Sequence, residues 1–404
     1  MHSSPVSSSE RLIHLDVLRG FALLGILIMN IQGFAMPLSA YMNPTTYGDL
    51  TGANAIIWSV SNLFADMKFM SLFSMLFGAG IILFVERAMA KEGSAAALHY
   101  KRNFWLVIFG LMHAHFIWFG DILFAYGFTA FILYFFRNLK TRGLIIWAIV
   151  FLGLASLYNL MAYFAIITGN MPDESIEMIM SFWDPGLEAH AAEIAAYTGT
   201  YAEQFAERSK IAIFMQVDNL PSIFLRVGGM MLIGMALYKS GALIGKRTPA
   251  FYYKLLMCLP IGVAITAYGQ LQNTSNGFTM EYSMFMGIQY NYWGSVLTAL
   301  GYVAMFNIIL EKGLLSGLCN RLAAVGRMAF TNYIMHSLVC TFIFYGIGLG
   351  LFGQFSRVEQ ILLVVTIWAV QLVISPMILR VWRFGPLEWL WRSLTYMKLQ
   401  PLKR

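Results

Sequence analysis

Long apolar stretches alternate with short polar connections along almost the whole chain. Each stretch reaches or approaches the length of about 20 residues that an α-helix needs to cross the hydrocarbon core of a bilayer. The pattern therefore predicts an all-α, polytopic integral-membrane bundle of about ten transmembrane helices. The predicted spans are residues 18–37, 55–85, 103–119, 121–136, 144–168, 211–238, 252–272, 283–310, 327–349 and 358–379.

The third and fourth spans are short, and only the turn Phe119-Gly120-Asp121 joins them. Either both spans cross the bilayer, or together they form one re-entrant hairpin that returns to the side from which it entered. The hairpin is acceptable only where protein covers its non-helical backbone.

The composition agrees with a membrane-embedded chain. Of the 404 residues, 59% are hydrophobic and 12% are charged, and the mean hydropathy is +0.66. A soluble protein carries roughly 25% charged residues. Because no internal repeat or linker divides the chain, we expect residues 1–404 to form a single integral-membrane domain in contact with the lipid bilayer.

Lys and Arg concentrate in alternate connections between the spans. This asymmetry predicts that both termini are cytoplasmic. The connection 170–210 is instead rich in Asp and Glu, so we expect an external acidic loop, or a lid of short helices over the bundle. The net charge of +7 is then explained by anchoring at the inner face. We expect no nucleic-acid partner.

Two histidines and an aspartate interrupt the apolar run from Phe104 to Phe136. They are His113, His115 and Asp121. Ionisable groups at membrane depth are costly and usually face a protein interior or a water-filled cavity. Either histidine could act as a general base or proton relay, or could be a core histidine bonded to a neighbouring helix. Residues two apart on a helix point about 200° away from each other, so we expect no metal site at this pair.

Asp121 follows Gly120 at the expected start of a helix, where a carboxylate can cap exposed backbone N–H groups. A second role is compatible with the first. The turn can fold Asp121 back toward His115 and orient the imidazole, as a carboxylate does in acyl-transfer triads. Counting 1.5 Å per residue from the inner-face charges places Asn30 and His113 both about 16 Å deep. We therefore expect them to line one cavity.

Two further polar residues lie near mid-membrane by the same count. Arg226 suits an anionic ligand, or a buried pair with Asp66 or Asp218. His336 lies one helical turn after Asn332, and hydrogen bonding to a neighbouring helix explains both. Arg226 and His336 are the candidate substrate-binding residues.

The C-terminal segment 384–397 predicts an amphipathic helix on the inner membrane surface. Trp389 and Trp391 would lie at the level of the lipid headgroups. Glu388 and Arg392 are spaced for an i to i+4 ion pair.

Four motifs carry a resemblance to a known family. They are Arg11-Leu-Ile-His-Leu-Asp-Val-Leu-Arg-Gly-Phe-Ala22, Gly120-Asp-Ile-Leu123, Gly326-Arg-Met-Ala-Phe-Thr-Asn-Tyr333 and Gly385-Pro-Leu-Glu-Trp-Leu-Trp-Arg-Ser-Leu-Thr-Tyr396. Over nearly the whole chain they resemble the YeiB-like family, a bacterial membrane domain of unknown function 418. The resemblance implies a multi-pass protein of the bacterial cytoplasmic (inner) membrane and little about its chemistry.

The opening Leu-Asp-x-Leu-Arg-Gly is also similar to that of transmembrane acyltransferases of the heparan glucosaminide acetyltransferase type. These enzymes carry acyl groups from cytosolic acyl-CoA to acceptors beyond the membrane. Asn30 matches an asparagine at the equivalent place. Their catalytic histidine, which follows soon after, has no counterpart here, and Tyr41 stands near the expected position. Either His113 or His115 has taken over that role, or the reaction has been lost.

The leading hypothesis is therefore an acyltransferase-like membrane protein with acyl-CoA as donor. Asp16 and Arg19 would help to receive the phosphate-bearing donor, although an ion pair that anchors the first helix explains the same two residues. Asn30 would polarise the acyl carbonyl.

In this hypothesis His113 or His115, oriented by Asp121, acts as the general base. The acceptor is a small molecule, a lipid or a glycan, and the oligomeric state is open, a homodimer included. The rival is a proton-linked transporter or lipid exporter, in which His113, His115, Asp121 and Arg226 form a relay and cavity. Secondary transporters usually contain internal repeats, and the sequence shows none, which argues against the transporter hypothesis. A non-catalytic membrane scaffold is the third alternative.

Overall fold

The computed structural model describes residues 12–403, which form helices joined by turns and loops, with one isolated β-bridge between Trp382 and Lys403. The N-terminal serines and Arg11 lie outside the described residues, as does Arg404. The helices of the bundle are α1 (Ile13–Ala35), α3 (Gly52–Phe64), α4 (Lys68–Glu92), α5 (Ala96–Phe116), α6 (Leu123–Leu133), α7 (Thr141–Ile167), α11 (Leu220–Lys239), α12 (Pro249–Leu256), α13 (Cys258–Ser275), α15 (Ile288–Glu311), α17 (Ala329–Phe344) and α18 (Arg357–Val381).

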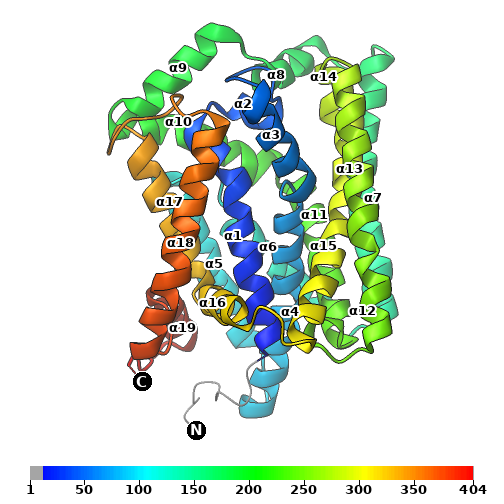
Figure 1. Ribbon diagram of the computed structural model, residues 1–404, viewed down its shortest axis with the longest axis vertical. Helices are drawn as coiled ribbons and strands as arrows, with labels where there is room; N and C mark the ends of the chain where they lie inside the picture. The colour runs from blue at the N-terminus through cyan, green and yellow to red at the C-terminus, as the bar shows by residue number, and fades with distance from the viewer. Residues whose placement is uncertain (1–11, 404) are drawn as a thin grey trace.

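Shorter helices cover the two ends of the bundle. They are α2 (Leu38–Met42), α8 (Asp173–Trp183), α9 (Gly186–Thr198), α10 (Tyr201–Ile213), α14 (Met280–Tyr282), α16 (Ser316–Arg327) and α19 (Pro386–Tyr396). Figure 1 shows α8, α9 and α10 across one end, and α16 and α19 at the other. The segment 170–210, expected as an external loop or lid, is thus largely helical.

Seven helical segments of the described chain are long and apolar enough to cross a membrane. The fold is accordingly that of a multi-pass membrane helical bundle. Among the spans predicted from the sequence, 121–136 and 327–349 correspond to shorter apolar helices, and 103–119 corresponds to α5, which begins earlier and includes Lys101 and Arg102. The count of ten crossings remains a prediction.

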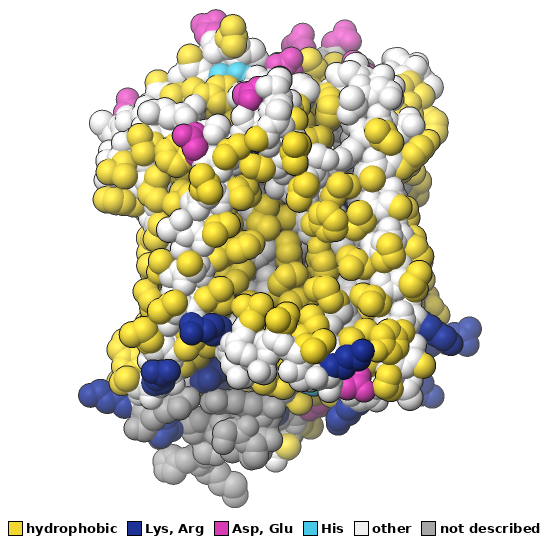
Figure 2. Space-filling view, viewed as in Figure 1, with side chains coloured by type: hydrophobic (Ala, Val, Ile, Leu, Met, Phe, Trp, Pro, Cys, Tyr) yellow, Lys and Arg dark blue, Asp and Glu magenta, His cyan; other side chains and the backbone are white. Residues whose placement is uncertain are grey.

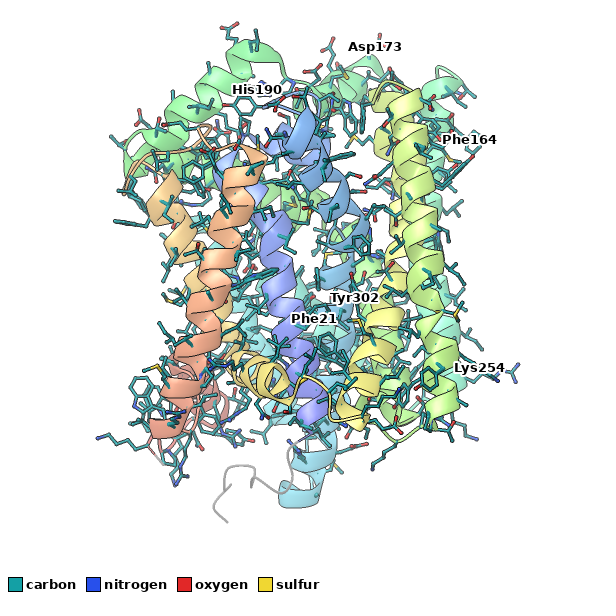
Figure 3. All side chains as sticks on the ribbon, in the orientation of Figure 1. Phe21, Phe164, Asp173, His190, Lys254 and Tyr302 are labelled. Atoms are coloured by element: carbon teal, nitrogen blue, oxygen red, sulfur yellow. The ribbon has the colours of Figure 1, made fainter. Side chains whose placement is uncertain are left out.

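Charge divides the two ends of the bundle. Figure 2 shows Lys and Arg around the end that carries α12 and α19, and Asp and Glu mainly at the end that carries α8 and α9, with an apolar belt between them. We call these the basic end and the acidic end. In Figure 3, Lys254 marks the former, and Asp173 and His190 mark the latter. By the positive-inside tendency, the basic end is the expected cytoplasmic face.

Helix α1 runs through the middle of the bundle (Figure 1), where it contacts α4, α15, α16, α17 and α18. Its approach to α16 depends on two glycines. A Cβ atom on Gly20 would lie 2.0 Å from the Leu322 carbonyl oxygen, and one on Gly326 would lie 2.0 Å from the Asp16 carbonyl oxygen. Small residues of this kind let helix backbones touch. Directly after Gly20, Phe21 packs edge-on against Tyr302 of α15 at 5.3 Å between ring centroids (Figure 3).

The C-terminal helix α19 packs against α5 and α17. The predicted Glu388–Arg392 ion pair is not formed. The Glu388 carboxylate instead accepts hydrogen bonds from the backbone N–H groups of Phe330 and Thr331, at 2.7 and 3.0 Å. The reason is that the first N–H groups of α17 have no partners within their own helix and attract a carboxylate. This contact joins the third and fourth sequence motifs.

Candidate functional site

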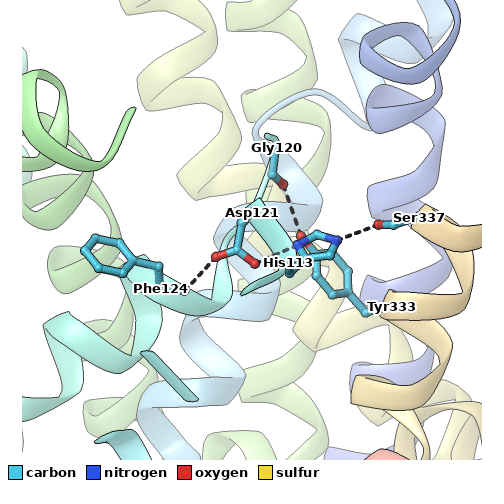
Figure 4. A network of polar contacts seen from close by, with 6 residues as sticks. All are labelled: His113, Gly120, Asp121, Phe124, Tyr333 and Ser337. Atoms are coloured by element: carbon cyan, nitrogen blue, oxygen red, sulfur yellow. Dashed lines mark hydrogen bonds and ion pairs between the residues drawn. The ribbon is translucent and has the colours of Figure 1, made fainter. Parts of the chain in front are cut away.

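The candidate site is built where α5 and α6 are separated by the turn 117–122. Asp121 Oδ1 accepts a hydrogen bond from the backbone N–H of Phe124 at 2.7 Å, which caps the start of α6 (Figure 4). Tyr333 of α17 donates a hydrogen bond to the Gly120 carbonyl at 3.1 Å. The turn is therefore held both by its own helix and by a neighbouring one.

His113 links Asp121 to Ser337 of α17. Its Nδ1 atom lies 2.8 Å from Asp121 Oδ2, and its Nε2 atom lies 2.8 Å from Ser337 Oγ (Figure 4). The side chains of His113 and Asp121 are only 1% and 2% exposed. When Nδ1–H donates to the carboxylate, Nε2 is left to accept the Ser337 hydroxyl proton, which is the arrangement of a Ser–His–Asp triad. Asp121 thus combines the capping and orienting roles that the sequence suggested.

The prediction that the turn folds Asp121 back toward His115 is wrong. His115 points to the opposite side of α5, where its ring nitrogens lie 3.2 Å from Ser209 Oγ and 3.2 Å from Gln216 Oε1. The reason is the helical period, which turns residues two apart to nearly opposite faces. The turn 117–122 returns along the face of His113, and the other face packs against α10.

Ser337 was not anticipated from the sequence. A hydroxyl in an apolar membrane helix is common, and Ser337 gains its significance only from its distance to His113, which is 224 positions away in the chain. Two residues so far apart in the chain form no local sequence motif.

A cavity of about 480 Å³ lies toward the acidic end, and we call it the outer cavity. Asn30 of α1, Asp121 and Tyr333 line it, together with Asp66 from the break between α3 and α4. The expectation that Asn30 and His113 line one cavity is wrong, because Asp121 and not His113 lines the outer cavity with Asn30. His113 lies behind Asp121 and Ser337 lies behind His113, since neither is among the lining residues.

A second cavity, of about 230 Å³, lies toward the basic end, and we call it the inner cavity. Arg19, Arg102 and Arg327 line it, with an apolar wall that includes Phe73 and Phe77. Arg19 also pairs with Asp16, with 3.2 Å between Nη1 and Oδ1. The sequence suggested two roles for Asp16 and Arg19. They could anchor α1 as an ion pair, or they could belong to an anion-binding site, and the structure is compatible with both roles.

The inner and outer cavities are adjacent. Ile26, Ile122, Tyr126 and Tyr333 line both of them, and we call these residues the septum. Tyr126 is held by a contact of 2.7 Å between its hydroxyl and that of Ser74. Tyr333 is held by its bond to Gly120 and lies 5.2 Å from the His113 ring. Asp121 directly precedes the septum residue Ile122, so the buried His113–Asp121 pair lies where the cavities approach each other.

The two candidate substrate-binding residues line neither cavity. Arg226 donates hydrogen bonds to Ser71 at 2.8 Å and Ser295 at 2.6 Å, so its bonds go to serines and the expected carboxylate pair is not formed. His336 Nε2 lies 2.8 Å from Gln371 Oε1 on α18. This is the interhelical hydrogen bond that the sequence offered as the structural explanation.

The chemistry available at the site is that of side-chain acids, amides and arginines. In residues 12–403, no group of His, Cys, Asp and Glu is placed to hold a metal ion. Asn30 makes no hydrogen bond to another side chain of the described residues and is directed to the outer cavity. A carbonyl compound in the outer cavity could therefore accept a hydrogen bond from its amide.

Comparison with known proteins reveals the family. The chain is 32% identical to the uncharacterized protein YeiB of Escherichia coli (strain K12), across 96% of each chain. It belongs to the DUF418 family. The family model, described as a protein of unknown function, matches residues 237–398. The chain is also 32% identical to the uncharacterized protein YxaH of Bacillus subtilis (strain 168), across 99% of this chain and 98% of the relative.

The resemblance to the YeiB-like family is thus confirmed. The matched DUF418 region contains Tyr333, Ser337 and Glu388, whereas His113 and Asp121 lie outside it. The full-length relatives extend the similarity over α5 and α6. A third relative, from Bacillus acidopullulyticus, is 27% identical across 98% of this chain.

Proposed function

We propose that this protein is a membrane acyltransferase that takes an acyl group from acyl-CoA at the basic end and passes it to an acceptor in the outer cavity. The observation that carries the proposal is the adjacency of an arginine-lined and a carboxylate-lined cavity at one septum, beside the buried His113–Asp121 pair. A reaction that joins substrates from two sides of a membrane requires this layout.

The inner cavity supplies the expected donor site. Phosphate groups prefer guanidinium partners, which bind them with charge-assisted and often bidentate hydrogen bonds. Arg19, Arg102 and Arg327 offer such donors, and the apolar wall beyond them suits the acyl chain. Arg102 is positioned by ring contacts, with its guanidinium 4.3 Å from the centre of the Trp391 ring.

The groups near the septum supply the expected chemistry. The Asn30 amide would stabilise negative charge on the thioester carbonyl oxygen. Asp121 would accept the proton that the acceptor loses, with His113 sharing its charge through the 2.8 Å contact. In this assignment, Asp121 faces the acceptor and His113 supports it from behind.

A proton-linked transporter or lipid exporter remains the second candidate, because opposed cavities and broken helices are also features of transporters. The acidic and basic cavities would then be two stages of one pathway. A transporter moves its ligand unchanged, whereas an acyltransferase releases free CoA and a modified acceptor. A scaffold without catalysis would do neither.

Two measurements separate these functions. Calorimetry on the purified protein should detect acyl-CoA binding, and lipid and glycan mass spectrometry of a deletion strain should reveal a missing acylated product. No binding at millimolar acyl-CoA would exclude the donor site. An unchanged set of acylated products, together with accumulation of an unmodified compound on one side of the membrane, would favour transport.

The proposal also includes a topology in the cytoplasmic (inner) membrane of a bacterium, with about ten crossings and cytoplasmic termini. The charge asymmetry between the basic and acidic ends supports it (Figure 2). A reporter fused after Arg404, or inserted between Lys246 and Arg247, should respond as cytoplasmic. One near Glu188 should respond as external, and the reverse pattern would overturn the assignment.

A further inference from the structure

The outer cavity has a charge character that the acyl-transfer proposal does not use. Its carboxylates come from Asp66 and Asp121, and no Lys, Arg or His is among the described residues that line it. We propose that the outer cavity binds an amphiphilic primary amine, with the ammonium group at Asp66 and Asp121 and the apolar part along the cavity wall.

Asp66 is built into the wall of the outer cavity. It lies between α3 and α4, where Met67 adopts a left-handed φ of 60°. Asp66 Oδ1 accepts a hydrogen bond from the Tyr41 hydroxyl at 3.1 Å, and Oδ2 accepts from the amides of Asn62 and Asn291 at 3.2 and 2.7 Å. Oδ1 thus accepts one side-chain hydrogen bond and Oδ2 accepts two.

Two cations lie behind this carboxylate. Lys68 is 0% exposed, and its ammonium donates to the Asn62 carbonyl at 2.6 Å and to the Asn291 side-chain oxygen. Arg226 is 5% exposed. Neither residue lines the outer cavity. A ligand in the outer cavity therefore meets the carboxylate oxygens of Asp66 rather than either cation.

The rest of the wall has amide and hydroxyl side chains, but most of it is apolar or aromatic, and this apolar part sets the chemistry of the ligand body. Methionine adapts to ligands of irregular shape, and aromatic rings attract cations. A phosphate or carboxylate ligand would find two carboxylates and no cation, and a polyol would leave the apolar wall uncovered. The methionines of the wall are Met29, Met42, Met67, Met70, Met215 and Met284, and its tryptophans are Trp58, Trp118 and Trp183.

The surface at the acidic end has the same sign as the two aspartates. Figure 2 shows Asp and Glu gathered at that end. Single-sign surfaces of this kind raise the local concentration of oppositely charged ligands and speed their association. An amine approaching from that end would thus be attracted both by the surface and by the cavity.

If the acyl-transfer proposal holds, the amine is the acceptor. Its ammonium loses one proton through Asp121 to solvent, and the nitrogen attacks the thioester carbon. The N–C bond forms as the C–S bond breaks. A second proton goes to the leaving thiolate, and the third stays on the amide nitrogen. The products are an N-acyl amine and free CoA. This step rests on the proposed function, whereas the binding of the amine does not.

Binding is tested with four probes that share one alkyl chain. The probes are octylamine, octyltrimethylammonium, 1-octanol and octanoate. Saturable binding of labelled octylamine to the protein in nanodiscs is measured against empty nanodiscs, with the other three as competitors. Octyltrimethylammonium should compete, and octanol and octanoate should require at least tenfold higher concentrations. Competition by octanoate equal to that by the trimethylammonium probe would overturn the inference.

Variants place the binding at the outer cavity. Asp66→Asn should weaken octylamine binding at least tenfold, whereas Asp184→Asn, an exposed acidic-end residue outside the lining, should leave it unchanged. Met284→Lys introduces a cation into the wall without touching the bonds of Asp66, so it should exchange octylamine binding for octanoate binding. Unchanged selectivity in both Asp66→Asn and Met284→Lys would contradict the assignment.

Acyl transfer is then measured separately. Octylamine should be acylated in the presence of acetyl-CoA, and octyltrimethylammonium, which has no N–H, should bind without reacting. Binding of both cations without any acylated product would refute acyl transfer to amines and leave the cation site standing. Acylation of 1-octanol in preference to octylamine would support acyl transfer and refute the amine.

Discussion

The inner and outer cavities use many of the same helices and yet have opposite chemistry. Helices α1, α4 and α17 contribute to both, and so does the septum of Ile26, Ile122, Tyr126 and Tyr333. The inner cavity has three arginines from α1, α5 and α16, and the outer cavity has two aspartates from the breaks between helices. Charge in this bundle is therefore set by a few residues near the helix ends and breaks, against a common apolar frame.

The comparison also separates polar groups that are already engaged from those that are available. Glu388 lines the inner cavity, but its carboxylate accepts bonds from the start of α17. Asn30 in the outer cavity makes no side-chain hydrogen bond within the described part of the chain. Apart from Glu388, the side chains with permanent charge that line the inner cavity are arginines, whereas those that line the outer cavity are aspartates, and the following changes test that contrast.

The largest effect is expected from Asp121→Asn. An asparagine still caps a helix, but its amide cannot accept the proton that the acceptor loses, as a carboxylate can. Acyl transfer should fall by about 10²–10⁴-fold, the usual contribution of general acid–base catalysis, while the yield of folded protein stays close to wild type. The loss of acyl transfer is measured as the rate at which free CoA is released from acyl-CoA.

His115→Ala is the matched control for this prediction, and His113→Ala is the partner variant. His115 lies on the same helix but contacts Ser209 and Gln216, so its removal should preserve the rate. His113→Ala should lower both rate and stability, because it leaves Asp121 and Ser337 without their buried partner. A full rate in Asp121→Asn would reduce this residue to a helix cap.

The second effect concerns the inner cavity. Hydrogen bonds to charged groups contribute roughly 1.5–3 kcal/mol, which corresponds to about a 10- to 100-fold change in affinity. Arg102→Gln should therefore raise the Kd for CoA by that factor in calorimetry. Arg142→Gln, an exposed arginine at the start of α7, should not change it. Equal losses in both variants would mean that CoA is attracted only by general surface charge.

Two of the predicted spans show which parts of the fold could be predicted from the sequence. The predicted span 358–379 corresponds to α18 (Arg357–Val381), and 144–168 corresponds to α7 (Thr141–Ile167). Both helices are largely exposed on the outside of the bundle. In the most apolar 18-residue stretch of each helix, 22% of the residues are buried for α18 and 33% for α7. Helices of this kind are specified by local composition and length, so they can be recognised without knowledge of their neighbours.

The site could be predicted only in part, for a physical reason. Asp121 was placed at a helix start, and Asn30 at a cavity, from local spacing and depth. The choice of His113 over His115, and the presence of Ser337 behind it, depend on how α5, α6 and α17 pack. Hydrogen bonds across 224 positions leave no periodic pattern in the chain. The positions of Arg226 and His336 away from both cavities depend on the same packing.

A third, smaller effect is expected at Glu388. Loss of a helix cap costs about 0.5–2 kcal/mol, so Glu388→Ala should lower the Tm by a few degrees. Glu388→Gln keeps an oxygen that can accept from Phe330 and Thr331, and it should recover most of that loss. If Glu388→Ala instead weakened CoA binding without any change in Tm, the carboxylate would belong to the ligand site rather than to the frame.

The smallest effect is a pH dependence of the acidic end. Burial raises the pKa of Glu193, from an ordinary 4.5 to about 7. Its carboxylate accepts a hydrogen bond from the backbone N–H of Leu38, a lining residue of the outer cavity, at 3.1 Å. The folded state therefore binds the proton more tightly than the unfolded chain. The stabilisation is complete below pH 4.5 and is lost as the pH rises through 7.

Hydrogen exchange of α9 checks this sign. Protection should decrease between about pH 5 and pH 8 in the wild type, after correction for intrinsic exchange, and the decrease should be absent in Glu193→Gln, which is neutral throughout. Glu188→Gln, an exposed neighbour on the same helix, should behave as wild type. Protection that instead increased with pH would contradict the burial of a carboxyl group at this contact.

The central claim is that a donor at the basic end and an acceptor at the acidic end meet at the septum, and transfer across a sealed membrane tests it most directly. Vesicles are loaded with labelled acetyl-CoA on the side of the basic end, and octylamine or native membrane extract is supplied on the other side. The account predicts labelled product on the acceptor side with the wild type and a loss of about 10²–10⁴-fold with Asp121→Asn. Wild-type protein that binds both ligands yet forms no more product than Asp121→Asn would contradict it.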